Sequence, residues 1–209
     1  MHHTIIPVTP FLQNCSVLWC EQTRQAVVID PGGDVDRIEQ VLEREYLIPT
    51  RILLTHGHLD HVGGATALAR KRAVPITGPQ QEDQFWLDSL PAQSEWLGFP
   101  RCEPFLPDEW LNEGDTIRFG QEILQVRHCP GHTPGHVIFF NAGGALAVVG
   151  DVLFKGSVGR TDFPGGNQAQ LMESIHRKLF SLGDEVGFIP GHGPGSTLGH
   201  ERRTNPYLR

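Results

Sequence analysis

The feature that most constrains this 209-residue chain is a run of metal-binding side-chain types placed directly after an apolar segment. Ile52–Leu54 is followed by His56, His58, Asp60 and His61. Side chains at i and i+2 point the same way on an extended backbone but diverge by about 200° on a helix. His56 and His58 therefore converge only where a strand has ended and no helix has begun. The segment predicts a buried strand followed by a turn that carries both histidines.

The rest of the run falls where the next helix is expected to begin. Asp60 and His61 leave the backbone in other directions, so they suit a second ion better than the first. The run is flanked by Gly57, Gly63 and Gly64. Four such side chains beside a core strand would mean unpaired polar groups or repelling imidazoliums unless a cation gathers them. We interpret the run as part of a metal centre.

Three further candidate ligands lie far along the chain, at the ends of apolar runs or in glycine-flanked loops. They are His132 in HCPGHTPGH, Asp151 in AVVGDVLF and His192 in IPGHGPG. Each is weak evidence alone, and Asp151 could simply cap a turn. Together they favour a single site built from loops at one edge of the sheets. His136 is assigned a supporting role, because metal ligands generally require partners that orient them.

Apolar spacing predicts short strands that flank and alternate with helices, in one domain spanning residues 1–209. Strands are expected at 4–8, 16–19, 26–30, 51–54, 116–119, 122–127, 137–140, 145–149 and 186–189, and helices at 35–46, 62–72 and 168–180. The sequence shows no internal repeat and no apolar run of about 18 residues. Its first residues do not have the pattern of a secretory signal, so we expect a cytoplasmic protein.

The charge distribution argues against a nucleic-acid partner. The net charge is −7. Between residues 82 and 115 a single base, Arg101, accompanies the acids Glu82, Asp83, Asp88, Glu95, Glu103, Asp108, Glu109, Glu113 and Asp115. Nucleic-acid binding requires a basic surface. We expect this acidic segment to be a solvated face. The 4 cysteines form no Cys-x-x-Cys pair and are expected to be reduced thiols.

Four motifs resemble, in order and separation, the metal motifs of the metallo-β-lactamase superfamily: THGHLDH (55–61), GHTPGH (131–136), GD (150–151) and GHG (191–193). The resemblance covers nearly the whole chain. It implies an α+β fold, a four-layer αββα sandwich with the metal site at the edge of the two sheets. It also implies two divalent ions, with zinc expected first, iron or manganese as alternatives, and one site able to stay empty.

The resemblance further implies a ligand set. One ion would lie with His56, His58 and His132, the other with Asp60, His61 and His192, and Asp151 would bridge them. Aspartate at the bridging position is similar to glyoxalase II and unlike true β-lactamases. Segments 152–166 and 193–208 look like the short form of that enzyme.

Glyoxalase II is a thioesterase that hydrolyses S-lactoylglutathione, a hydroxyacylglutathione, to D-lactate and glutathione. The resemblance implies this activity here, with hydroxide formed from water on the two ions as the nucleophile and Asp60 as the catalytic residue that holds it in line. Arg160 and Lys155, in the loop after Asp151, could bind the carboxylates of glutathione. The alternative for both is that they are solvated loop cations.

Other activities stay open on the same scaffold. Glutathione persulfide dioxygenases resemble this chain too, and they use a single iron, here held by His56, His132 and Asp151. Lactone hydrolysis is a further alternative, whereas a non-catalytic role is disfavoured because every ligand position is filled. The expected partner is a small glutathione thioester, with no nucleic acid and no membrane; the sequence makes no prediction of oligomeric state.

Overall fold

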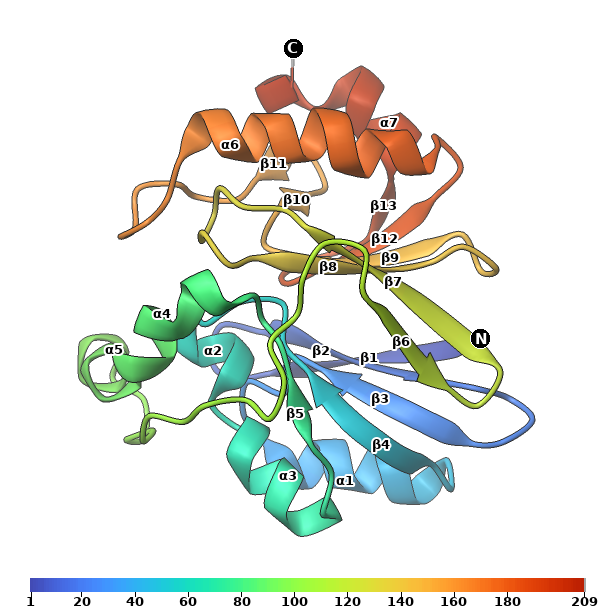
Figure 1. The fold of residues 1–209 in the computed structure, drawn as a ribbon, viewed down its shortest axis with the longest axis vertical. Helices are drawn as coiled ribbons and strands as arrows, with labels where there is room; N and C mark the ends of the chain where they lie inside the picture. Colours follow the sequence, from blue (N-terminus) through green and yellow to red (C-terminus); the bar gives the residue numbers. More distant parts are fainter. Residues whose placement is uncertain (209) are drawn as a thin grey trace.

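The computed structural model describes residues 1–208, which form two β-sheets packed face to face with helices on both outer sides (Figure 1). The first sheet contains, in spatial order, β1 (His2–Val8), β2 (Gln13–Trp19), β3 (Gln25–Ile29), β4 (Ile48–Leu53) and β5 (Ile76–Thr77). The second contains β13 (Ser196–Thr197), β12 (Gly187–Pro190), β9 (Leu146–Gly150), β8 (Val137–Asn141), β7 (Glu122–His128) and β6 (Thr116–Phe119). β10 (Leu153–Phe154) and β11 (Ser157–Val158) form a separate hairpin.

Helices complete the outer layers. On the side of the first sheet lie α1 (Val35–Arg44), α2 (Leu59–Val62), α3 (Ala65–Arg72), the 3-10 turn η1 (Gln81–Asp83), α4 (Gln84–Asp88) and α5 (Leu90–Leu97). On the side of the second lie α6 (Gln168–Glu173), its continuation as the π-helical η2 (Ser174–Leu179), η3 (Phe180–Leu182), α7 (Leu198–Thr204) and η4 (Pro206–Leu208). The predicted four-layer αββα sandwich is confirmed. Within residues 1–208, no helix is long and apolar enough to cross a membrane.

Apolar side chains explain the layers. Phe139 of β8 and Leu53 of β4 belong to one buried cluster between the sheets. Ile38 of α1 packs in a second cluster beneath the first sheet, and Leu171 of α6 in a third above the second sheet. All four side chains are fully buried, and burial of each such side chain stabilises the fold by about 1.5–3 kcal/mol. Because helices cover it on one side and a sheet on the other, β8 is buried at every position.

The predicted strands are all present, whereas the helix predicted at 62–72 is confirmed only over 65–72. It divides into α2 and α3 at Gly63 and Gly64, where the chain packs against an earlier loop. The Gly64 amide donates to the Pro31 carbonyl at 2.8 Å. A Cβ on Gly63 would lie 2.7 Å from the Gly32 carbonyl oxygen, so only glycine permits this approach.

Candidate metal centre

Loops from both sheets meet at one edge of the sandwich. β3 is parallel to β4, and β9 is parallel to β12. Parallel neighbours end at the same edge of a sheet, so the residues that follow these strands gather there. They include Asp30 after β3, His56 after β4, Asp151 after β9 and His192 after β12. His132 joins them from the loop between β7 and β8.

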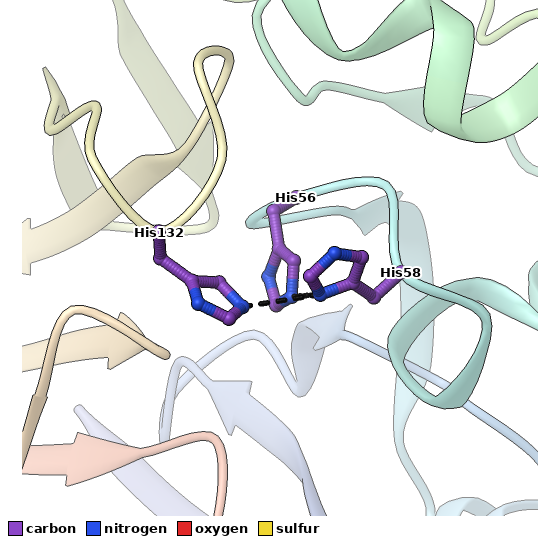
Figure 2. A group of neighbouring side chains, drawn as sticks. All are labelled: His56, His58 and His132. Atoms are coloured by element: carbon purple, nitrogen blue, oxygen red, sulfur yellow. Dashed lines mark hydrogen bonds between the residues drawn. The ribbon is translucent and has the colours of Figure 1, made fainter. Parts of the chain in front are cut away.

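Three histidines form the first cluster. His56 Nε2 lies 3.1 Å from His58 Nδ1, and His132 Nε2 lies 3.1 Å from the same atom. Figure 2 shows the three rings directed toward one another, with His132 on a different segment from the other two. Metal–nitrogen bonds of about 2 Å in a tetrahedral site place ligand atoms at about this separation. The geometry therefore fits one metal ion, and the turn after β4 holds His56 and His58 as predicted.

Asp60, His61 and His192 form the second cluster. Asp60 Oδ2 lies 3.2 Å from His192 Nε2 and 3.8 Å from His61 Nε2. Asp60 and His61 lie in the short helix α2, whose N-cap is His58, so their side chains leave in a different direction from the first pair. This is the divergence that the sequence predicts.

Asp151 lies between the two clusters. Its Oδ1 is 3.5 Å from His61 Nε2 in the second cluster, and its Oδ2 is 3.6 Å from His132 Nε2 in the first. The same Oδ2 lies 3.8 Å from His192 Nε2. One carboxylate thus reaches both clusters, so the structure brings together all seven predicted ligand residues.

Two unpaired buried atoms indicate that these residues fit cations. His61 Nε2 and Asp151 Oδ1 have no hydrogen-bond partner among residues 1–208. Leaving a buried polar atom unpaired costs about 1–3 kcal/mol, which a bound cation would offset. Burial alone would lower the pKa of His61, but the surrounding carboxylates, Asp151 foremost, raise it to about 10. A proton on His61 balances the carboxylates here, and metal binding would displace it.

The histidines of the first cluster are held neutral. Burial, followed by the neighbouring imidazoles, lowers the pKa of His56 well below its ordinary value. Burial also lowers the pKa values of His58 and His132. Neutral imidazole is the form that binds metals. The first cluster is therefore ready to accept an ion at neutral pH.

Asp30 and Thr55 orient the ligands, and the sequence interpretation missed both. Asp30 Oδ2 lies 2.9 Å from His61 Nδ1 and accepts the Thr55 hydroxyl at 2.6 Å. Thr55 Oγ1 lies 3.0 Å from His56 Nδ1. These contacts leave the Nε2 atoms of His56 and His61 free for a metal. The sequence offered one signal, the aspartate at the end of the apolar run AVVID. In the structure this residue, Asp30, adopts a φ of 52°.

Asp83 was predicted to lie on a solvated face, and this prediction is wrong. Its side chain is 0% exposed. It accepts hydrogen bonds from the Gly57 amide at 2.9 Å, the Thr133 hydroxyl at 2.8 Å and the Gly135 amide at 2.6 Å. One carboxylate therefore joins the turn that holds His56 and His58 to the loop that holds His132.

Further contacts to the candidate ligands are made by backbone and by His136. His132 Nδ1 lies 2.7 Å from the Arg160 carbonyl oxygen, and His192 Nδ1 lies 3.2 Å from that of Phe11. The Asp151 amide donates to His136 Nε2 at 3.1 Å, and the His136 ring stacks on His56 at 4.7 Å. His136 thus touches Asp151 and His56, where a supporting role was predicted.

A cavity of about 730 Å³ opens over both clusters, and Lys155 and Arg160 line it. Arg160 forms two hydrogen bonds with Asp162, at 2.9 and 2.7 Å, and its guanidinium lies 4.4 Å above the Phe163 ring. Lys155 forms no ion pair with any of residues 1–208. Of the two cationic side chains predicted to bind the substrate, Lys155 is therefore the freer to contact a carboxylate.

Comparisons with known proteins agree with this geometry. The family model described as "Metallo-beta-lactamase superfamily" matches residues 8–192. The hydroxyacylglutathione hydrolase GloC of Haemophilus influenzae is 46% identical over 100% of this chain and 98% of its own length. The crystal structure of the BLEG-1 B3 metallo-beta-lactamase has a TM-score of 0.92 with 36% identity, covering 99% of both chains. That of TTHA1623 in a di-iron-bound form has a TM-score of 0.89 with 38% identity, covering 98% of this chain and 100% of the other.

Proposed function

Because this chain belongs to the metallo-beta-lactamase superfamily, we propose that it is a metal-dependent hydrolase of hydroxyacylglutathione thioesters. The expected reaction converts S-lactoylglutathione to D-lactate and glutathione. The observation that carries the proposal is the convergence of seven histidine and aspartate side chains on two adjacent clusters. Full-length similarity to a hydroxyacylglutathione hydrolase supports this choice of substrate.

Two divalent ions are proposed as the cofactor. His56, His58 and His132 would hold one, Asp60, His61 and His192 the other, and Asp151 would contact both. Bound divalent ions lower the pKa of water to about 7 and stabilise negative charge on a carbonyl oxygen. Zinc is our first choice because imidazole and carboxylate suit it. Iron is the alternative, supported by the di-iron form of a similar protein.

Asp60 is proposed to orient the attacking water. It lines the cavity and lies between His61 and His192. Burial raises the pKa of Asp60, but His61 and His192 lower it by more. The net pKa is below its ordinary value, so the carboxylate is ionised at neutral pH. An ionised carboxylate accepts a hydrogen bond from water and can hold it in line with the thioester carbon. The leaving thiolate, with a pKa of about 8.5, requires no dedicated acid.

The cavity suits a molecule of the size of a glutathione thioester, since ligand pockets usually measure about 300–1,000 Å³. Lys155 is proposed to bind a carboxylate of the glutathione part, and Arg160 to contribute less because Asp162 already pairs with it. We also propose a cytoplasmic location, where glutathione is abundant and keeps thiols reduced.

The test is steady-state hydrolysis of S-lactoylglutathione beside a lactone and nitrocefin, with metal content measured on the same sample. We expect thioester turnover with two metal ions per chain. The nitrocefin arm is included because a B3 metallo-beta-lactamase is 36% identical. If the protein hydrolyses nitrocefin or the lactone but not the thioester, the proposed substrate is wrong.

The alternative activity, glutathione persulfide dioxygenation, is tested by oxygen uptake on the same preparation. It requires one iron on His56, His132 and Asp151. The second donor cluster beside this set favours two ions and hydrolysis. Oxygen consumption on glutathione persulfide, with one iron per chain and no thioester cleavage, would contradict the proposal.

A further inference from the structure

We propose that the cavity contains a separate site for the acyl group, formed by Trp86, Trp96 and Phe163, which we call the aromatic groove. The enzyme then prefers thioesters of 2-hydroxy acids that carry a bulky apolar or aromatic substituent over the lactoyl thioester. This inference rests on the proposed thioesterase function and adds to it the class of acyl group.

The aromatic groove begins at the first cluster. The Trp86 ring lies 4.4 Å from the His58 ring, and the Phe163 ring lies 5.3 Å from it. Phe163 also meets both tryptophans edge-on, at 6.3 Å from Trp86 and 6.1 Å from Trp96. All three side chains line the main cavity. A group attached to a carbonyl at the clusters would therefore enter aromatic surroundings immediately.

The groove also extends away from the clusters. A second hollow of about 600 Å³ shares Trp86, Trp96 and Phe163 with the main cavity and continues to Phe85 and Pro164. Trp96 is 68% exposed and Phe85 is 40% exposed. Neighbouring large apolar side chains that remain in water mark a surface suited to an apolar ligand. The space is larger than the methyl group of a lactoyl substrate needs.

The side of the cavity next to the second cluster adds an exposed cation to its aromatic lining. The hairpin of β10 and β11 brings the exposed Lys155 to the side of the second cluster, where the Phe154 ring lies 6.4 Å from the His192 ring. On the aromatic side, the charge of Arg160 is balanced by Asp162.

The two sides indicate how a thioester is oriented. A glutathione thioester joins a charged peptide to an acyl group through a single carbonyl carbon. With that carbon at the clusters, the peptide carboxylates face Lys155 and the acyl substituent faces the aromatic groove.

S-mandeloylglutathione is the probe, because its phenyl group replaces the lactoyl methyl. Water attacks the carbonyl carbon, the new C–O bond forms and the C–S bond breaks. One proton of the water passes to the thiolate to give glutathione, and the other is released to solvent, which leaves mandelate. A few buried carbons change specificity by roughly 10-fold or more. We expect kcat/KM for the mandeloyl thioester to exceed that for the lactoyl thioester by about tenfold.

The decisive variant is Trp96→Ala, because an exposed side chain can be removed with little effect on folding. The measured quantity is the ratio of kcat/KM for mandeloyl to lactoyl thioester, so that the intrinsic reactivity of each substrate and the active fraction of each preparation cancel. We expect Trp96→Ala to lower this ratio by about tenfold. Trp96→Phe should restore most of it. Phe11→Ala is the matched control, since Phe11 is a 45% exposed aromatic residue of the same cavity and its carbonyl oxygen contacts His192.

A binding measurement independent of metal completes the test. Calorimetry on chelator-treated protein should give S-benzylglutathione about tenfold tighter binding than S-methylglutathione, and Trp96→Ala should abolish the difference. If the protein hydrolyses S-lactoylglutathione but Trp96→Ala leaves both ratios unchanged, the acyl site is refuted and the proposed function stands. An equal loss in Phe11→Ala would mean that the acyl group is not confined to the aromatic groove and would also refute the proposal. Failure of the metal-loaded protein to hydrolyse either thioester would refute both proposals together.

Discussion

A single carboxylate, Asp151, lies within 3.5–3.8 Å of ring nitrogens from both histidine clusters. We expect Asp151→Ala to lose bound metal and to lower kcat/KM by at least about 100-fold, the loss typical of damage to a metal site. Metal content by plasma mass spectrometry, measured with the kinetics, checks this. Asp162→Ala is the control, because Asp162 is an exposed aspartate near the same site, and it should keep its full metal content. Full metal content in Asp151→Ala would contradict its proposed contact with both ions.

Asp83 makes stability depend on pH. Burial raises the pKa of this carboxyl from 3.8 to about 6, against three hydrogen-bond donors that lower it. A raised carboxyl pKa gives a stabilising contribution that is complete well below pH 4 and is lost as the pH rises from about 4 through about 6. This difference in pKa corresponds to about 3 kcal/mol.

Asp83→Asn tests this contribution, because asparagine does not titrate. We expect the gap in free energy of unfolding, wild type minus Asp83→Asn, to decrease by roughly 2 kcal/mol from pH 4 to pH 7. Urea denaturation with EDTA present measures it without a contribution from metal release. Asp88→Asn, an exposed change on the same segment, serves as control. A gap that is independent of pH would sink the prediction.

At the scale of single residues, the sequence predicted the members of the two clusters and the neighbouring His136, but it did not predict the contacts of Asp30 and Asp83. His56 and His58 stand out because ligand-type residues are dense and their spacing has a geometric meaning. Asp30 and Asp83 do not, because a lone aspartate after a strand or in an acidic segment usually faces solvent. Their importance depends on burial among donors that are distant in sequence, such as Gly135 for Asp83.

At the scale of the elements, the loop after β12 approaches the site so closely that it requires glycine. A Cβ at Gly191 would lie 2.0 Å from Asp151 Oδ1. We expect Gly191→Ala to displace Asp151 and lower both metal content and kcat/KM by about 10–100-fold. At Gly187 the nearest atom to a new Cβ is 3.8 Å away, so Gly187→Ala should keep its metal content. Equal metal content in the two variants would show that the loop can move aside.

Strands and helices with a regular apolar pattern could be predicted from the sequence, whereas helices that bury polar side chains could not. The strand predicted at 116–119 coincides with β6. α5 was missed because its inner face includes Gln93, which accepts from the Leu59 amide and donates to the Trp86 carbonyl. α7 was missed because its buried position 201 is a glutamate, which accepts from the Gly156 amide. Burial of these polar side chains depends on tertiary partners, so no local periodicity reveals it.

At the scale of the whole molecule, the site connects the two halves of the sandwich. His56, His58 and Asp60 follow the first sheet, whereas His132, Asp151 and His192 belong to loops of the second. Bound ions would therefore bridge the two sheets at their shared edge. The motif order predicted this arrangement through family resemblance, whereas the apolar spacing alone predicted only sheets with helices packed outside them.

Metal removal should consequently destabilise the whole protein and not only the site. A ligand present at 1,000 times its dissociation constant stabilises the folded state by about 4 kcal/mol. For a domain of this size, that corresponds to a fall in Tm of roughly 8–16 °C on chelation. Differential scanning calorimetry with and without EDTA measures the shift, and we expect added Zn²⁺ to reverse it. Ca²⁺ should not, because it requires oxygen ligands and five of the seven proposed ligands are histidines. Asp151→Ala should show a smaller shift than wild type, and an unchanged wild-type Tm after verified metal loss would mean that the ions do not bridge the sheets.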